Sequence, residues 1–85
     1  MKSEVVVNYA EQIARIIGKA AMIDPSRVRP ETKLSELGID SLARIECVFN
    51  IEDTFHVEIR EHDLWKLRTV QDIIDSVEQA LAAGR

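Results

Sequence analysis

Hydrophobic residues recur at helical spacing near both ends of this 85-residue chain. Each stretch places its apolar residues on one side of a helix, which predicts helices over Ser3–Ala21 and Val70–Ala82. Thr69 and Asp72 form a capping-box pattern at the start of the second of these helices. The stripes consist of Val6, Tyr9, Ile13, Ile16, Ile17 and Ala20 in the first, and Ile73, Ile74, Val77, Ala80 and Leu81 in the second.

The middle of the chain predicts two further helices and one long loop. Ser41–Phe55 contains neither Gly nor Pro and follows Asp40, a favoured N-cap residue. A short helix is expected over Glu61–Leu67, after an extended connection at residues 56–59. Residues 24–40 carry two prolines and a glycine, which predicts a loop with one helical turn at Leu34–Leu37. The fold class is therefore all-α: a small four-helix bundle, three helices longer and one short, with a long loop between the first two.

Composition narrows the function classes. Eleven basic and fifteen acidic residues give a net charge of −4, which argues against a nucleic-acid partner. A single cysteine excludes an internal disulfide. No apolar run is long enough to span a bilayer, and the apolar run at the N-terminus is too short for a signal peptide. We expect one domain over residues 1–85, cytoplasmic and without membrane insertion.

The string Gly38-Ile39-Asp40-Ser41-Leu42 joins the loop to the predicted helix over Ser41–Phe55. The first turn of a helix has unpaired N–H groups and the positive end of the helix dipole, so a phosphate is stabilised there. A serine at such a position is usually a cap. Asp40 precedes Ser41 and can cap the helix instead, which leaves the Ser41 hydroxyl available for a phosphodiester.

This string resembles the attachment site of the acyl carrier proteins (ACPs), and the likeness extends over nearly the whole chain. The resemblance implies that Ser41, flanked by Asp40 and Leu42, carries covalent 4′-phosphopantetheine from coenzyme A. It implies a monomeric carrier, not an enzyme, that holds acyl groups as thioesters for fatty-acid or specialised lipid or polyketide biosynthesis. The implied partners are a phosphopantetheinyl transferase (holo-ACP synthase), an acyl-ACP synthetase, ketosynthases and acyltransferases.

The helix after Ser41 has apolar residues on two sides, although a small bundle needs to bury only one. One side groups Leu42, Ile45 and Phe49. Its flanks carry Glu46, Glu52 and Asp53. These residues are either the core with its solvated edge or a docking face for partners, and the carrier resemblance favours docking.

A cleft between this helix and residues 59–67 could shelter an acyl chain, lined by Val48, Ile59, Leu64 and Ile73. The alternative is that these four residues only pack the core. Arg44 lies on the core side of the helix at 100° per residue, and it makes the docking face less uniformly negative than in housekeeping carriers. The choice between fatty-acid synthesis and a dedicated pathway therefore stays open.

The sequence gives weaker support to other kinds of site. A triad of Ser41 with His56 or His62 and Asp63 lacks an oxyanion-hole signature, and no metal-ligand spacing is present. Cys47 and Trp65 are expected in the core. A peptidyl or aminoacyl carrier, or a helical interaction module without a prosthetic group, remain alternatives to the acyl carrier.

Overall fold

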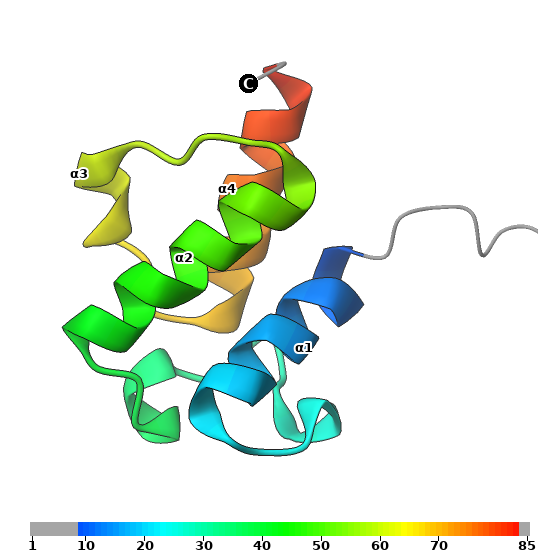
Figure 1. The fold of residues 1–85 in the computed structure, drawn as a ribbon, viewed down its shortest axis with the longest axis vertical. Coiled ribbons are helices and arrows are strands. Elements are labelled where there is room, and N and C mark those ends of the chain that lie inside the picture. Colours follow the sequence, from blue (N-terminus) through cyan, green and yellow to red (C-terminus); the bar gives the residue numbers. More distant parts are fainter. Residues whose placement is uncertain (1–8, 84–85) are drawn as a thin grey trace, which may run out of the picture.

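The computed structural model of the protein describes residues 9–83, except for the side chains of residues 61 and 62, and within this range it is all-helical. Figure 1 shows how the four helices and the loop are arranged. The elements in chain order are α1 (Tyr9–Ala21), the 3₁₀ turns η2 (Pro25–Arg27) and η3 (Leu34–Leu37), α2 (Ser41–Phe55), α3 (Glu61–Leu64) and α4 (Val70–Ala82).

The predicted fold class is confirmed, and the bounds of α2, α4 and η3 agree with the sequence-based expectation. The prediction that α1 begins at Ser3 lies outside the described residues. The turn η2 was not predicted, and α3 ends at Leu64 rather than Leu67. None of the helices in the described part of the chain is both long and apolar enough to cross a membrane.

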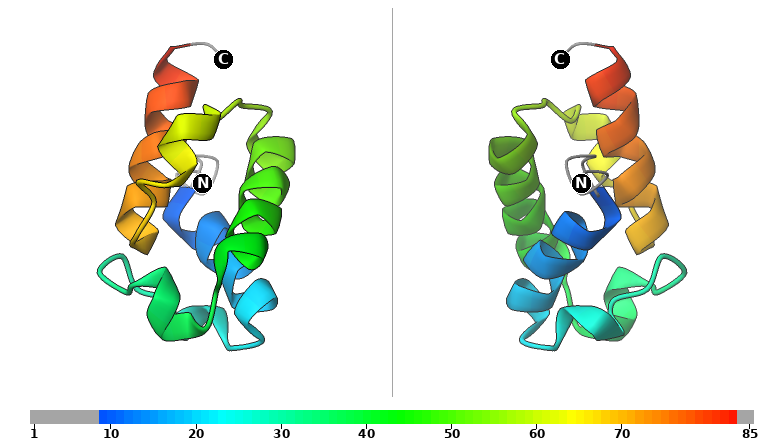
Figure 2. Two further views of the ribbon diagram at one scale, coloured as in Figure 1. Left: turned by 90° about the vertical axis from the view of Figure 1, so that its left-hand side faces the viewer. Right: turned by 90° about the vertical axis from the view of Figure 1, so that its right-hand side faces the viewer.

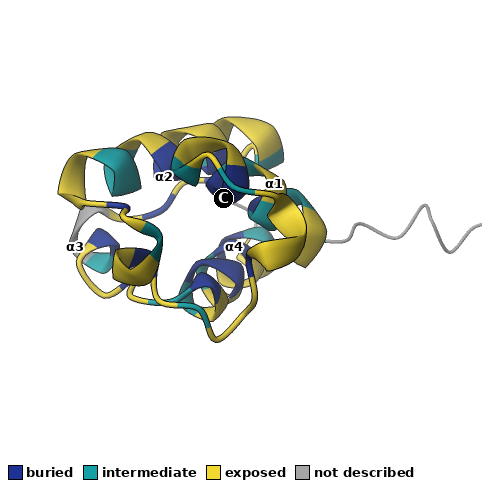
Figure 3. Ribbon diagram, turned by 90° about the horizontal axis from the view of Figure 1, so that it is seen from below, coloured by how far each residue is buried: buried dark blue, intermediate teal, exposed yellow. Residues whose placement is uncertain are grey.

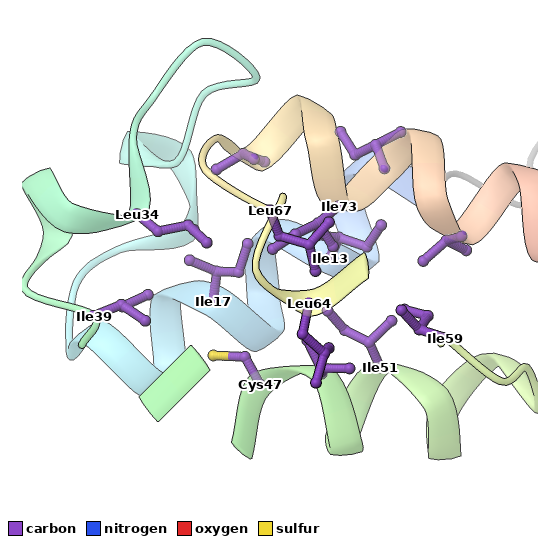
Figure 4. Packing of buried hydrophobic residues seen from close by; sticks show 14 of the residues in the cluster. Ile13, Ile17, Leu34, Ile39, Cys47, Ile51, Ile59, Leu64, Leu67 and Ile73 are labelled. Atoms are coloured by element: carbon purple, nitrogen blue, oxygen red, sulfur yellow. The ribbon is translucent and has the colours of Figure 1, made fainter. Parts of the chain in front are cut away.

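The long helices α1, α2 and α4 enclose a hydrophobic core, and α3 lies across the space between α2 and α4 (Figure 2). Seen from below, the buried residues face the interior and the exposed ones face outward (Figure 3). The core draws on every helix and on the loop, including Ile13 and Ile17 from α1, Ile51 from α2 and Ile73 from α4 (Figure 4). Each helix therefore buries one face against the others, and burial of these side chains is the main stabilising term.

The long loop between α1 and α2 is held against the start of α4 by backbone hydrogen bonds. The Leu34 N–H donates to the Arg68 carbonyl at 2.9 Å, and the Val70 N–H donates to the Thr32 carbonyl at 3.0 Å. The Leu34 side chain is buried in the core between them. The loop is consequently an ordered part of the fold, and it delivers the chain to the start of α2 in one position.

Two expectations about the core are wrong. Trp65 is 56% exposed, because α3 ends just before it and the neighbouring Leu64 and Leu67 take the buried positions. Ala20 is exposed on α1, although the residues before it in the stripe at helical spacing, Ile13 and Ile17, are buried.

The start of α4 supplies a pH-dependent test of stability. Partial burial acts to raise the pKa of the Asp72 carboxyl, but hydrogen bonds from the Arg68 and Thr69 amides outweigh it, and the net pKa lies below its ordinary value. A carboxyl with a depressed pKa stabilises the fold at neutral pH, and this contribution is lost as the pH falls through the folded-state pKa.

We expect Asp72→Asn to lower the free energy of unfolding by about 1 kcal/mol at pH 7. The difference from wild type should narrow as the pH falls below 3.8, the carboxyl's ordinary value. Urea unfolding at several pH values measures it. Glu78→Gln, on the exposed side of the same helix, is the control and should track wild type throughout. If the difference in the free energy of unfolding between Asp72→Asn and wild type does not change with pH, the stabilising role of the ionised Asp72 carboxylate is contradicted.

Candidate functional site

The turn before α2 is built by Gly38 and Ile39. Gly38 ends η3 with φ = 77°, in the left-handed region where a side chain is disfavoured. The Ile39 N–H donates to the Leu34 carbonyl at 3.1 Å. Its side chain is only 3% exposed and joins the core. The chain therefore reverses at Gly38 and is anchored at Ile39, one residue before the helix cap.

Asp40 caps α2, as predicted. Its Oδ1 accepts a hydrogen bond from the Ala43 N–H at 2.9 Å, and its carbonyl accepts one from the Arg44 N–H at 2.9 Å. Ser41 is the first residue of α2 and is exposed. Within residues 9–83, the amides of Ser41 and Leu42 have no hydrogen-bond acceptor, so they face solvent at the positive end of a helix of 15 residues. A phosphodiester on the Ser41 hydroxyl fits this position.

The side of α2 that begins at Leu42 is on the surface. Leu42 is 66% exposed and Phe49 is 62% exposed, while Ile45 between them is half-buried. The opposite side of the helix supplies the buried residues Cys47, Val48 and Ile51. The core alternative for Leu42 and Phe49 is therefore excluded, and α2 presents an apolar strip to solvent.

The three acids beside this strip have different roles. Glu46 and Asp53 are exposed. Glu52 is half-buried, and its Oε2 accepts a hydrogen bond from the Ile59 N–H at 2.7 Å. The docking role of Glu52 stays a prediction, and the structure gives its carboxylate a further role: it ties the end of α2 to the connection that leads into α3.

The four residues of the predicted acyl pocket come together in space. Val48, Ile59, Leu64 and Ile73 are all buried members of the core cluster, contributed by α2, the α2–α3 connection, α3 and α4. A pocket of about 290 Å³ lies beside them between the connection and α4, and of the four only Ile59 lines it. Its wall also includes the charged Glu58, Arg60 and Asp63.

The alternative chemistries find no support in the described geometry. His56 ends α2, about 20 Å from Ser41 along a helix of this length, so these two residues are too far apart for a catalytic pair. The side chain of His62 lies outside the described residues. The Cys47 thiol is buried, and burial, with the Glu46 charge, raises its pKa, which makes it unreactive. Among the described residues, no cluster of His, Cys, Asp and Glu could hold a metal.

The chain is similar in sequence to a known family of proteins. The family model "Phosphopantetheine attachment site" matches residues 11–77, which include the whole junction before α2. The chain is 36% identical over 74 residues to an acyl carrier protein of Thermosynechococcus vestitus, covering 86% of this chain and 91% of the relative. This chain belongs to the acyl carrier protein family.

Two further similar proteins are also acyl carrier proteins. A crystal structure of an acyl carrier protein from Thermotoga maritima superimposes with a TM-score of 0.76 at 31% identity, covering 87% of both chains. A chloroplastic acyl carrier protein of Brassica napus is 32% identical over 76 residues, 88% of this chain and 57% of the relative. Because the relatives include a chloroplastic form, family membership assigns no single compartment.

Family membership fixes the kind of chemistry. Acyl carrier proteins are carriers rather than enzymes, and their phosphopantetheine-binding domain holds a covalently attached 4′-phosphopantetheine. Members of the family interact with phosphopantetheinyl transferases and with biosynthetic enzymes.

The contrast between Glu52 and Glu46 gives a stability test. Glu52→Ala should lower the free energy of unfolding by roughly 1.5 kcal/mol, because the Ile59 amide loses a charged acceptor in a half-buried position. Glu46→Ala, an exposed change on the same helix, should stay within about 0.5 kcal/mol of wild type. Chemical denaturation of both variants measures the difference, and equal effects contradict the structural role of Glu52.

Proposed function

We propose that Ser41 is the residue that carries 4′-phosphopantetheine in this acyl carrier protein. The observation that supports this most strongly is the division of labour at the start of α2: Asp40 caps the helix through Ala43, and the Ser41 hydroxyl is exposed. Asp40 and Leu42 flank the serine and, in this proposal, form the attachment site with it. The group's terminal thiol, when attached, supplies the thioester that carries the acyl chain.

The attachment reaction needs little from the carrier itself. The Ser41 Oγ attacks the phosphorus of coenzyme A that bears the pantetheine, and adenosine 3′,5′-bisphosphate leaves. In this proposal the hydroxyl proton passes to a base on the transferase, because the carboxylate next to Ser41, that of Asp40, already caps α2 through the Ala43 N–H. What the carrier supplies is the exposed hydroxyl and the positive end of α2, which stabilises the new phosphodiester.

The docking face in this proposal consists of Leu42, Ile45 and Phe49, with Glu46 and Asp53 on its flanks. The exposed apolar side chains supply contact area, and the two carboxylates speed the approach of a basic partner surface. Glu52, beside this face, accepts a hydrogen bond from the Ile59 N–H and so links the end of α2 to the α2–α3 connection. The transferase, an acyl-ACP synthetase, ketosynthases and acyltransferases are the partners proposed for it.

The cargo in this proposal is an acyl intermediate of fatty-acid or specialised lipid biosynthesis. Burying its methylene groups is favourable by about 0.8 kcal/mol per CH₂. The residues proposed to shelter the chain, Val48, Ile59, Leu64 and Ile73, are all members of the hydrophobic core cluster. An acyl chain that enters there extends the hydrophobic core.

The attachment site is tested by a pair of serine variants. Ser35 is exposed near the start of η3, as Ser41 is at the start of α2, so Ser35→Ala is the matched control. Incubated with coenzyme A and a transferase, wild type and Ser35→Ala should each gain one phosphopantetheine by intact mass. Ser41→Ala should gain none, and modification of that variant overturns the assignment.

The docking face is tested by charge reversal. The double variant Glu46→Lys/Asp53→Lys should slow association with the transferase by about tenfold at low ionic strength, and salt should weaken the effect. Glu31→Lys/Glu78→Lys changes the net charge equally at exposed positions elsewhere and should leave the rate near that of wild type. Thermal unfolding of both should stay close to wild type, since exposed charges contribute little. Equal slowing in the two double variants argues against a localised face.

A further inference from the structure

The Arg44 side chain is an unusual member of the buried side of α2. Arg44 precedes Ile51 by seven residues, so the two point within about 20° of each other on a helix. Ile51 is completely buried. Arg44 is accordingly half-buried, and its Nε is buried without a hydrogen-bond partner. A charged side chain occupies a position where the rest of the helix presents Cys47, Val48 and Ile51 to the core.

A buried N–H without an acceptor is unfavourable, because the group has lost water and gained nothing in return. The Nε of Arg44 is the one side-chain nitrogen or oxygen in this condition among the described residues. An aliphatic side chain of the same length could fill this space without that cost. This buried donor therefore points to an acceptor that arrives from outside the described part of the chain.

The position of Arg44 relative to the proposed attachment point bears on which acceptor it could meet. It lies three residues after Ser41, about 4.5 Å further along the helix axis, on the way from the proposed attachment site to the core residue Val48. An arm bonded to Ser41 starts in solvent, where water already satisfies its oxygens. An oxygen on an acyl chain that enters the protein loses its water and needs a donor.

We propose that the Arg44 Nε–H donates a hydrogen bond to an oxygen on the acyl chain itself, so that this carrier favours keto- or hydroxyacyl groups over plain hydrocarbon chains. The inference rests on the proposed function, since the chain has to be attached at Ser41. The Arg44 Nε–H and the oxygen on the acyl chain have both lost water, and the hydrogen bond between them offsets the loss for both groups. A site that offers a buried donor discriminates against analogues that lack the acceptor.

The side chain of Glu61 lies outside the described residues, so an acceptor within the protein has to be tested by substitution at this position. A second competitor is the arm, through its amide or phosphodiester oxygens. A third is the thioester carbonyl, which every acyl group carries. The experiment therefore has to separate four sources of oxygen.

The test follows the Arg44 Nε–H signal in ¹H–¹⁵N spectra of the apo, holo, octanoyl and 3-oxooctanoyl forms, each verified by intact mass. Loss of the signal in Arg44→Met assigns it. The signal should be alike in the first three forms and in apo Glu61→Gln. It should shift in the 3-oxooctanoyl form, with hydrogen exchange slowed by about tenfold as the N–H gains a partner.

Thermal unfolding provides an independent readout. In wild type the 3-oxooctanoyl form should melt at a higher temperature than the octanoyl form. Arg44→Met should remove this difference while it keeps the stem length. Arg27→Met, at an exposed position in η2, should preserve the difference.

Each contrary result overturns the inference in a recognisable way. A shift that is complete in the holo form assigns the acceptor to the arm, and equal shifts in both acylated forms assign it to the thioester carbonyl. A change in apo Glu61→Gln assigns it to an internal ion pair. A protein that gains no phosphopantetheine removes the proposed function, and this inference with it, whereas a loaded protein with an unmoved signal removes the inference alone.

Discussion

The hydrogen bond from the Ala43 amide to the Asp40 carboxylate is the interaction on which the site depends. It fixes where α2 begins, and it satisfies one of the orphan donors of the first turn without using the serine. The bond in turn needs the reversal at Gly38 and the buried anchor at Ile39, which aim Asp40 at the helix start. Loss of such a cap costs about 0.5–2 kcal/mol, and here it would also release the residue that precedes Ser41.

The two apolar sides of α2 have different roles in the proposed function. One side, with Cys47, Val48 and Ile51, holds the helix to the core. The other, with Leu42 and Phe49, stays in solvent at some cost in solubility. Such exposure has no benefit for the isolated fold, whereas in the proposed function it gives a small protein a surface that successive partners can share. The Glu52 bond to the Ile59 amide keeps this surface in register with the α2–α3 connection.

Much of the fold could be predicted because local signals agreed with one another. For α2 and α4, a Gly- and Pro-free run followed a good cap, and the predicted bounds match the structure. The capping box of Thr69 and Asp72 is present as expected. The cap at the junction was predictable for the same reason, since Asp40 is a favoured N-cap residue directly before a Gly- and Pro-free run.

What could not be predicted depends on tertiary contacts. The sequence around Trp65 offers three large apolar residues within four positions, and only the packing decides that Leu64 and Leu67 go inside. Glu52 looked like a surface acid because its partner, the Ile59 amide, is seven residues away. The early end of α3 and the unpartnered Nε of Arg44 likewise depend on neighbours that periodicity does not reveal.

The central claim, that the capped start of α2 makes Ser41 the attachment residue, is tested most directly by mapping the prosthetic group on unaltered protein. Trypsin cleaves after Lys33 and Arg44, and the peptide between them contains both Ser35 and Ser41. Fragmentation of this peptide from the holo protein should place phosphopantetheine on Ser41 alone. Phosphopantetheine on Ser35, or on a peptide from elsewhere in the chain, would contradict the account.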